Sequence, residues 1–128
     1  MTDQQLIQKA KSVRKNAYAP YSDFKVSCAL LSTTGKVYTG VNVENASYGL
    51  TTCAERMAVF SAVSQGERDF EKIAIVTDTK EPKNLCGACL QVLSEFCQDL
   101  KIICATVNGK RKDYTLKELL PKDFKKIR

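Results

Sequence analysis

Residues 72–107, KIAIVTDTKEPKNLCGACLQVLSEFCQDLKIICATV, place two apolar runs on either side of a segment with helical periodicity. Residues 72–77 and residues 101–107 are short and rich in Ile and Val, which is typical of buried strands. Between them, residues 86–98 repeat apolar side chains at spacings of three and four, which predicts a helix. Buried strands that alternate with helices favour an α/β fold.

The segments outside this stretch supply the other layers of the predicted fold. Apolar side chains from Leu6 to Ala17 predict an opening amphipathic helix, with Thr2 and Gln5 at capping-box spacing and Pro20 as its end. The other predicted elements are a hairpin of residues 25–32 and 36–43 turning at Gly35, a helix over residues 53–65 ending at Gly66, a strand over residues 110–114 reached through the Asn108-Gly109 turn, and a short helix over residues 116–120. We therefore predict a single domain over residues 1–128, an α/β fold built as a three-layer α/β/α sandwich around a mixed sheet of about five strands.

The chain has 128 residues, six cysteines and no histidine. At this length a single domain buries roughly two-thirds of the surface that the unfolded chain exposes, so one core suffices. The absence of histidine excludes catalytic groups that use imidazole, and it excludes metal sites with His ligands. A transition-metal site in this chain must therefore depend on cysteine thiolates.

The N-terminal residues carry neither the basic segment nor the apolar run of a secretory signal. No run approaches the roughly 18 apolar residues of a membrane span. We expect a cytoplasmic protein that does not bind membranes and whose cysteines stay reduced. The net charge is +6, but residues 110–128 alone hold eight basic and three acidic side chains. A basic tail is usually a solvated segment, so we expect no nucleic-acid partner.

Two cysteine-containing segments predict the chemistry: Cys53-Ala54-Glu55-Arg56 and Cys86-Gly87-Ala88-Cys89. Cys86 and Cys89 stand three residues apart at the start of a predicted helix, so their sulfurs can bind one ion. If the helix that begins at Cys53 packs beside it, three thiolates converge and a fourth coordination position stays open. Taken alone, a Cys-x-x-Cys segment is as typical of a redox pair, or of half a structural zinc site, as it is of a catalytic metal site. Taken alone, Glu55 is typical of a solvated residue on a helix. Positions two apart do not share a helix face, so the spacing leaves open whether Glu55 reaches the metal.

The two segments together match the signature of the zinc nucleobase deaminases. Over nearly its whole length the chain resembles the small homotetrameric cytidine deaminases of nucleoside salvage. The further landmarks that carry this resemblance are Pro20-Tyr21-Ser22 with Phe24, residues 40–50 (GVNVENASYGL), and Leu119-Leu120-Pro121 with Phe124. The resemblance implies hydrolytic deamination of cytidine and 2′-deoxycytidine to uridine and 2′-deoxyuridine by a homotetramer.

The resemblance also implies roles for individual residues. Cys53, Cys86 and Cys89 would bind one Zn²⁺ per subunit, which activates water, while Glu55 moves protons. Arg56 would donate N–H···S hydrogen bonds that offset the excess negative charge of zinc bound by three thiolates. The residues implied to bind the nucleoside are Phe24, Asn42, Glu44 and Ala54 of one subunit, and Ala46, Tyr48 and Phe124 of its neighbour.

Three features depart from the usual pattern of this family. Leu85 stands where a proline commonly precedes the Cys-Gly-Ala-Cys segment, Leu90 where an arginine follows it, and Ser27-Cys28 where Gly-Ala is frequent. An alternative substrate is therefore a modified cytosine nucleoside or a nucleoside antibiotic. The short chain disfavours a polynucleotide-editing deaminase, and a non-enzymatic zinc module would complete four protein ligands without needing Glu55. The remaining cysteines, Cys28, Cys97 and Cys104, are expected to be packing residues.

Overall fold

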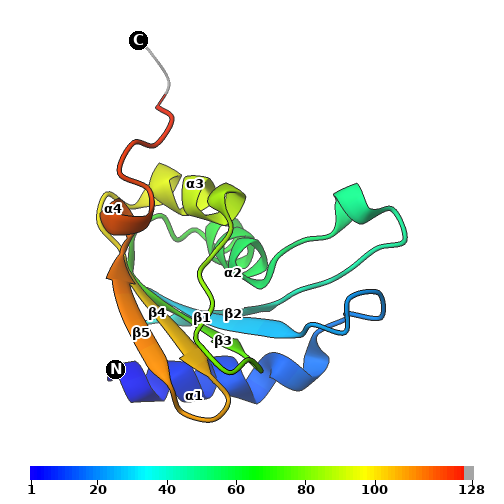
Figure 1. Ribbon diagram of the computed structural model, residues 1–128. Coiled ribbons are helices and arrows are strands. Elements are labelled where there is room, and N and C mark those ends of the chain that lie inside the picture. Colours follow the sequence, from blue (N-terminus) through cyan, green and yellow to red (C-terminus); the bar gives the residue numbers. More distant parts are fainter. Residues whose placement is uncertain (126–128) are drawn as a thin grey trace.

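A five-stranded mixed sheet forms the centre of the computed structural model, which describes residues 1–125 (Figure 1). The strands are β1 (Val26–Ser32), β2 (Val37–Val41), β3 (Phe70–Thr77), β4 (Lys101–Thr106) and β5 (Arg111–Thr115). Their order in the sheet is β2-β1-β3-β4-β5, with β3 and β4 parallel and the other neighbours antiparallel. The predicted five strands and the mixed character of the sheet are confirmed.

Helices cover both faces of the sheet, which confirms the predicted three-layer sandwich. In Figure 1, α1 (Asp3–Val13) lies below the sheet, and α2 (Ala54–Ser64) and α3 (Gly87–Phe96) lie above it. Within β1, Ala29 and Leu31 pack into the cluster around α1, whereas Cys28 and Leu30 pack into the cluster around α2 and α3. The remaining helices are η1 (Arg14–Asn16), η2 (Tyr48–Leu50) and α4 (Leu116–Leu119). Within residues 1–125 no helix is both long and apolar enough to cross a membrane.

The first helix is shorter than predicted. α1 ends at Val13, a single 3₁₀ turn follows, and the chain is extended well before Pro20. The N–H of Tyr18 donates to the carbonyl of Asn42, and the carbonyl of Tyr18 accepts from the N–H of Glu44, each at 2.9 Å. This bridge requires an extended backbone, so a long-range contact ends the helical pattern that the apolar spacing indicated.

Glycines with positive φ form the predicted turns. Gly35 has φ 91° and Gly109 has φ 97°, and Gly66, which follows the end of α2, has φ 95°. Asn108 does not share the positive φ of Gly109, although a two-residue type I′ turn would require it at both positions. The β4–β5 hairpin is therefore a wider three-residue loop, which the N–H of Thr106 closes by donating to the carbonyl of Lys110 at 2.8 Å.

The start of α2 lies unusually close to the sheet at Gly40 of β2. A Cβ atom at Gly40 would lie 2.2 Å from the carbonyl oxygen of Ala54 and 2.7 Å from the backbone nitrogen of Ala58. The thiol of Cys28, on the neighbouring β1, donates to the same Ala54 carbonyl at 3.1 Å. Glycine is thus the residue that fits here, and the sheet fixes the position of the first turn of α2.

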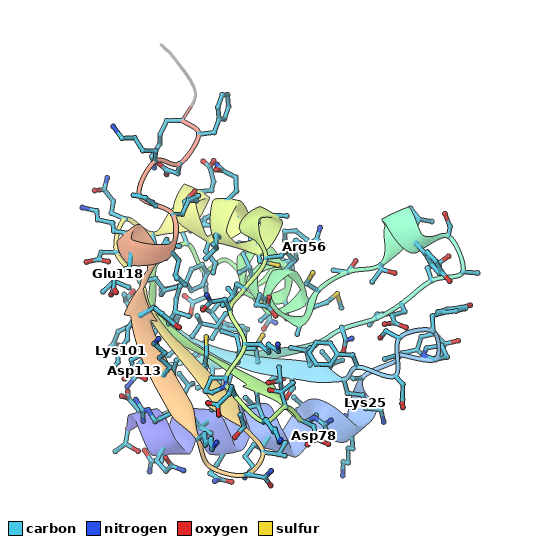
Figure 2. All side chains as sticks on the ribbon, viewed as in Figure 1. Lys25, Arg56, Asp78, Lys101, Asp113 and Glu118 are labelled. Carbon is cyan, nitrogen blue, oxygen red and sulfur yellow. The ribbon has the colours of Figure 1, made fainter. Side chains whose placement is uncertain are left out.

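An ion cluster holds α1 against the face of the sheet opposite α2 and α3. Asp3 accepts hydrogen bonds from Lys101 at 2.6 Å, from Lys72 at 2.7 Å and from Arg111 at 3.0 Å. Arg111 also pairs with Asp113 at 2.7 Å, and Figure 2 labels Lys101 and Asp113 side by side on β4 and β5. The hydrogen bond from Lys101, followed by those from Lys72 and Arg111, lowers the pKa of Asp3 below its usual value of 3.8.

Candidate active site

Three cysteine sulfurs meet where the N-terminal ends of α2 and α3 approach each other. The Sγ atoms of Cys53, Cys86 and Cys89 all lie within 4.8 Å of one another, and those of Cys86 and Cys89 are 3.4 Å apart. Zn–S bonds of about 2.3 Å at tetrahedral angles would separate each pair of sulfurs by about 3.8 Å. The donor set therefore fits one zinc ion with three thiolate ligands. In the described part of the chain no further Cys, His, Asp or Glu joins this group, so a tetrahedral ion bound by these sulfurs would keep one coordination position for a non-protein ligand.

Helix starts bring the three sulfurs together. Cys53 and Cys86 are the N-cap residues of α2 and α3, and both have an extended backbone. Cys89 lies one turn into α3 and faces the same point. The free N–H groups and the dipole at helix N-termini favour thiolates. The predicted convergence of two helix starts is therefore present.

Glu55 lies beside the sulfurs, which the spacing in the sequence had left open. Its side chain is 6% exposed and lines the same cavity as Cys53 and Cys86. Because Cys53 is an N-cap residue outside the helix, the rule that helix positions two apart point in different directions does not apply to this pair. Burial raises the pKa of the Glu55 carboxyl, while a hydrogen bond from Cys89 opposes that shift. A carboxyl with a raised pKa is suited to accepting and returning a proton.

Arg56 contacts the sulfur of Cys53. Its Nη2 atom donates to Cys53 Sγ at 3.3 Å, and Figure 2 labels the side chain where α2 and α3 approach each other. Hydrogen bonds from Cys89 and from Arg56 lower the pKa of Cys53 to about 5. The hydrogen bond to Cys53, together with burial, raises the pKa of Cys89. The predicted N–H···S contact is present.

A cavity of about 250 Å³ opens beside the sulfurs at the carboxyl end of β3. It is lined by Glu55 and by two of the three cysteines, Cys53 and Cys86. Three of the predicted nucleoside-binding residues, Phe24, Asn42 and Ala54, also line it. Ligand sites in open α/β sheets commonly lie beyond the carboxyl ends of the strands, and the position of this cavity agrees with that rule.

The other predicted binding residues lie outside this cavity. Glu44 accepts hydrogen bonds from the backbone N–H groups of Tyr21 at 3.0 Å and Ser22 at 3.1 Å. The side chains of Tyr48 and Phe124 are 74% and 77% exposed, and Ala46 is exposed as well. In Figure 1 the segment that contains η2 extends to the right of the body, and the C-terminal segment extends above it.

Four polar residues that no motif singled out also line the cavity: Thr51, Thr77, Lys83 and Asn84. Thr77 is the last residue of β3. Lys83 and Asn84 lie two to three residues before Cys86 in the sequence. Their positions close to the end of a predicted strand and to the Cys86 motif were the features of the sequence that could have identified them as cavity residues.

The remaining cysteines are thiols within or against the core. Burial raises the pKa of Cys97 to about 11 and that of Cys104 to about 12, and it also raises the pKa of Cys28. A thiol with a raised pKa is a poor nucleophile and a poor metal ligand at neutral pH. These residues therefore pack as predicted, and Cys28 also donates the hydrogen bond to Ala54 described above.

Known proteins are similar to this chain in sequence and in fold. Residues 1–106 match the family model described as the cytidine and deoxycytidylate deaminase zinc-binding region. A cytidine deaminase from Halalkalibacterium halodurans is 50% identical over 125 residues, which cover 97% of this chain and 95% of that protein. The crystal structure of a cytidine deaminase from Burkholderia pseudomallei has a TM-score of 0.94 and 47% identity, covering 97% of this chain and 100% of that one. A blasticidin-S deaminase from Bacillus cereus is 32% identical over 111 residues, 79% of each protein.

Proposed function

This chain belongs to the cytidine and deoxycytidylate deaminase family, and we propose that it hydrolyses cytidine and 2′-deoxycytidine to uridine and 2′-deoxyuridine, with release of ammonia. The observation that carries the proposal is a buried carboxyl, Glu55, in one cavity with a three-cysteine cluster. This combination is the zinc deaminase arrangement, in which the carboxylate is not a metal ligand. The expected biological setting is pyrimidine nucleoside salvage.

Zinc is the metal that this donor set favours. Three thiolates with one open position suit a catalytic zinc site, and Cys53, Cys86 and Cys89 would hold the ion. When bound, Zn²⁺ supplies Lewis-acid activation of a water molecule for attack at C4 of the pyrimidine. Arg56 would offset the excess negative charge of the three thiolates through its hydrogen bond to Cys53.

Glu55 is proposed to act as both base and acid. Its carboxylate accepts a proton from the attacking water and delivers it to N3 of the pyrimidine, and the same group then assists the departure of ammonia from C4. Its burial supports this role because a carboxyl shielded from bulk water keeps the proton within the cavity. The product is the uracil nucleoside, so one water is consumed for each ammonia released.

The nucleoside is proposed to bind along the cavity beside Glu55. Phe24 and Ala54 would pack against it, Asn42 would form a hydrogen bond with a ribose hydroxyl, and Glu44 would accept one from a ribose hydroxyl. A carboxylate has about four acceptor sites, and the loop that contains Ser22 occupies three of those on Glu44. The remaining site would suit a free 3′-hydroxyl, whereas the negative charge would repel a phosphate and so disfavour polynucleotides.

The active enzyme is proposed to be a homotetramer in which Ala46, Tyr48 and Phe124 complete the cavity of a neighbouring subunit. Large exposed apolar side chains, which typically mark protein interfaces, support this proposal, among them Tyr48, Leu50, Phe60 and Phe124. The Gln91 side chain holds the main chain of Phe124 through hydrogen bonds of 2.9 and 3.0 Å, so the aromatic ring is presented from a fixed backbone.

A modified cytosine nucleoside or a nucleoside antibiotic is the second candidate substrate. The similarity to blasticidin-S deaminase supports it, although the identity is lower than to the cytidine deaminases. The metal ligands and Glu55 would perform the same chemistry on either substrate. Turnover of cytidine, 2′-deoxycytidine and blasticidin S, measured on one enzyme preparation, separates the two candidates.

The proposed function is tested by Glu55→Ala with metal analysis in parallel. We expect about one zinc per chain in both the wild type and the variant, and a loss of cytidine deamination in the variant of about 10²- to 10⁴-fold. Glu71→Ala is the matched control, because Glu71 is exposed on β3 and lies outside the cavity lining. A zinc-loaded wild type that is inert toward every cytosine nucleoside would overturn the proposal.

A further inference from the structure

The loop that leads into β1 contains a strained residue next to the cavity. Asp23 has φ 55°, and among residues 1–125 it is the one non-glycine residue with positive φ. L-residues rarely adopt this conformation, and such residues persist where the surrounding structure holds them. The next residue, Phe24, lines the cavity. The loop therefore keeps an unfavourable backbone conformation at the point where it delivers an aromatic ring to the site.

Ser22 and Glu44 hold this loop from one side. The Ser22 hydroxyl donates to one carboxylate oxygen of Glu44 and accepts a hydrogen bond from the N–H of Phe24 at 3.0 Å. The other carboxylate oxygen of Glu44 accepts from the N–H groups of Tyr21 and Ser22. The Ser22 hydroxyl thus links the Glu44 side chain to the backbone of Phe24.

Asn42 holds the loop from the other side. Its Nδ2 atom donates to the carbonyl of Phe24 at 2.7 Å, and its Oδ1 atom accepts from the N–H of Val26 at 2.9 Å. Both backbone polar groups of Phe24 are therefore bound by side chains, one from its own loop and one from the segment that follows β2. This arrangement fixes the backbone of Phe24, although its ring remains 40% exposed.

We propose that Ser22 is a positioning residue for substrate binding, which acts by fixing Phe24 at the cavity wall. This inference rests on the function proposed above. Ser22, Asp23 and Phe24 are all exposed, so little packing would order the loop without these hydrogen bonds. Without the Ser22 hydroxyl, the N–H of Phe24 would lose its partner while Asn42 still held the carbonyl, so part of the ordering of the loop would come at the expense of nucleoside binding energy. The proton-transfer group, Glu55, lies on α2 and does not depend on this loop.

Ser22→Ala should therefore raise KM and leave kcat almost unchanged. We expect the KM for cytidine to rise about tenfold, which corresponds to one lost hydrogen bond, and kcat to change by less than about twofold. Ser22→Thr keeps the hydroxyl on an exposed side chain and should restore the KM. Ser12→Ala is the matched control, because Ser12 is an exposed serine on α1, on the other face of the sheet, and its hydroxyl bonds within the helix.

A double-mutant cycle with Phe24→Ala identifies how Ser22 acts. If Ser22 works through Phe24, then Ser22→Ala adds less than about twofold to the KM of the Phe24→Ala enzyme. The inference would be overturned if the KM increases of Ser22→Ala and Phe24→Ala multiplied in the double variant. It would also be overturned if Ser22→Ala had the KM of the wild type, or if Ser22→Thr did not restore the KM. An inert wild type would instead overturn the proposed function, so the two failures are distinguishable.

Discussion

Glu55 and Arg56 are consecutive residues with opposite tasks around the same sulfurs. Glu55 is buried in the cavity, where burial raises the pKa of its carboxyl. Arg56 remains charged, and its contact with Cys53 stabilises that residue as a thiolate. Three thiolates carry more negative charge than zinc neutralises, and such a charge makes a metal-bound water less acidic. At the scale of a residue, therefore, the single contact between Arg56 and the Cys53 sulfur would influence the acidity of a water bound to the metal.

Arg56→Gln is expected to retain zinc but to lower kcat by about tenfold or to shift the activity profile toward higher pH, because the excess negative charge is no longer offset. Metal content and the pH dependence of kcat measure the two effects separately. Arg68→Gln is the control, since Arg68 is exposed beyond the end of α2 and donates to the nearby carbonyls of Val63 and Glu67. An unchanged rate and profile in Arg56→Gln would contradict this role.

At the scale of an element, the position of α2 depends on how closely the sheet approaches it. The Ala54 carbonyl, in the first turn of α2, lies over Gly40 and accepts the hydrogen bond from Cys28. Cys53 and Glu55 flank Ala54 in the sequence, so any displacement of this turn moves a metal ligand and the proton-transfer group together. Gly40, a strand residue that takes no part in the reaction, thereby determines where the metal ligand and the proton-transfer group lie.

Gly40→Ala is expected to lower the free energy of unfolding by about 2 kcal/mol or more, because its Cβ would collide with backbone atoms that cannot rotate away. Zinc content and activity should fall with it. Denaturant unfolding and metal analysis measure both effects. In Gly35→Ala the added Cβ meets nothing within 4 Å but has an unfavourable φ of 91°, so we expect a loss of about 1 kcal/mol and full zinc content. Equal effects of the two variants would contradict the close-approach argument.

At the scale of the whole molecule, the ion cluster around Asp3 joins elements that are far apart in the sequence. Asp3 lies in the first turn of α1, and its partners come from β3, β4 and β5. Lys72, Lys101 and Arg111 lie on the face of the sheet that α1 covers, whereas the cavity lies on the face covered by α2 and α3. The cluster thus contributes to global stability while leaving the site untouched.

Asp3→Asn is expected to reduce stability in a pH-dependent way. The pKa of Asp3 is lower in the folded state than its usual value of 3.8, so the unfolded chain takes up the proton first. The stabilisation is therefore complete well above that value and is lost as the pH falls below it. At pH 7 the variant should be less stable by about 1–2 kcal/mol, which allows for the partial exposure of the partners.

Denaturant unfolding of wild type and variant at a series of pH values from about 7 to about 2 measures this difference. The difference in the free energy of unfolding between the wild type and Asp3→Asn should become smaller as the pH falls. Asp99→Asn is the control, because Asp99 is exposed and forms no ion pair within the described residues, and its curve should follow that of the wild type. If the difference in the free energy of unfolding stayed constant with pH, Asp3 would stabilise the fold through something other than its charge.

Periodicity and residue type determined much of this protein in advance. The alternation of apolar runs and helical segments predicted the layers and strands, because a buried strand and an amphipathic helix each leave a local pattern. The absence of histidine and the spacing of Cys86 and Cys89 predicted a thiolate metal site, since few other ligands were available. Resemblance to a known family then supplied the roles that spacing alone could not give.

The contacts between distant segments depend on the folded chain and not on any local pattern. The tertiary structure ended α1 early through the pairing of Tyr18 with the segment after β2, and it placed Glu55 beside the sulfurs by making Cys53 an N-cap residue. It also engaged Glu44 with the loop around Ser22. Each outcome depends on where one element lies relative to another. The local sequence determines which conformation a segment prefers. The hydrogen bonds and close approaches that can override this preference exist only once the chain has folded.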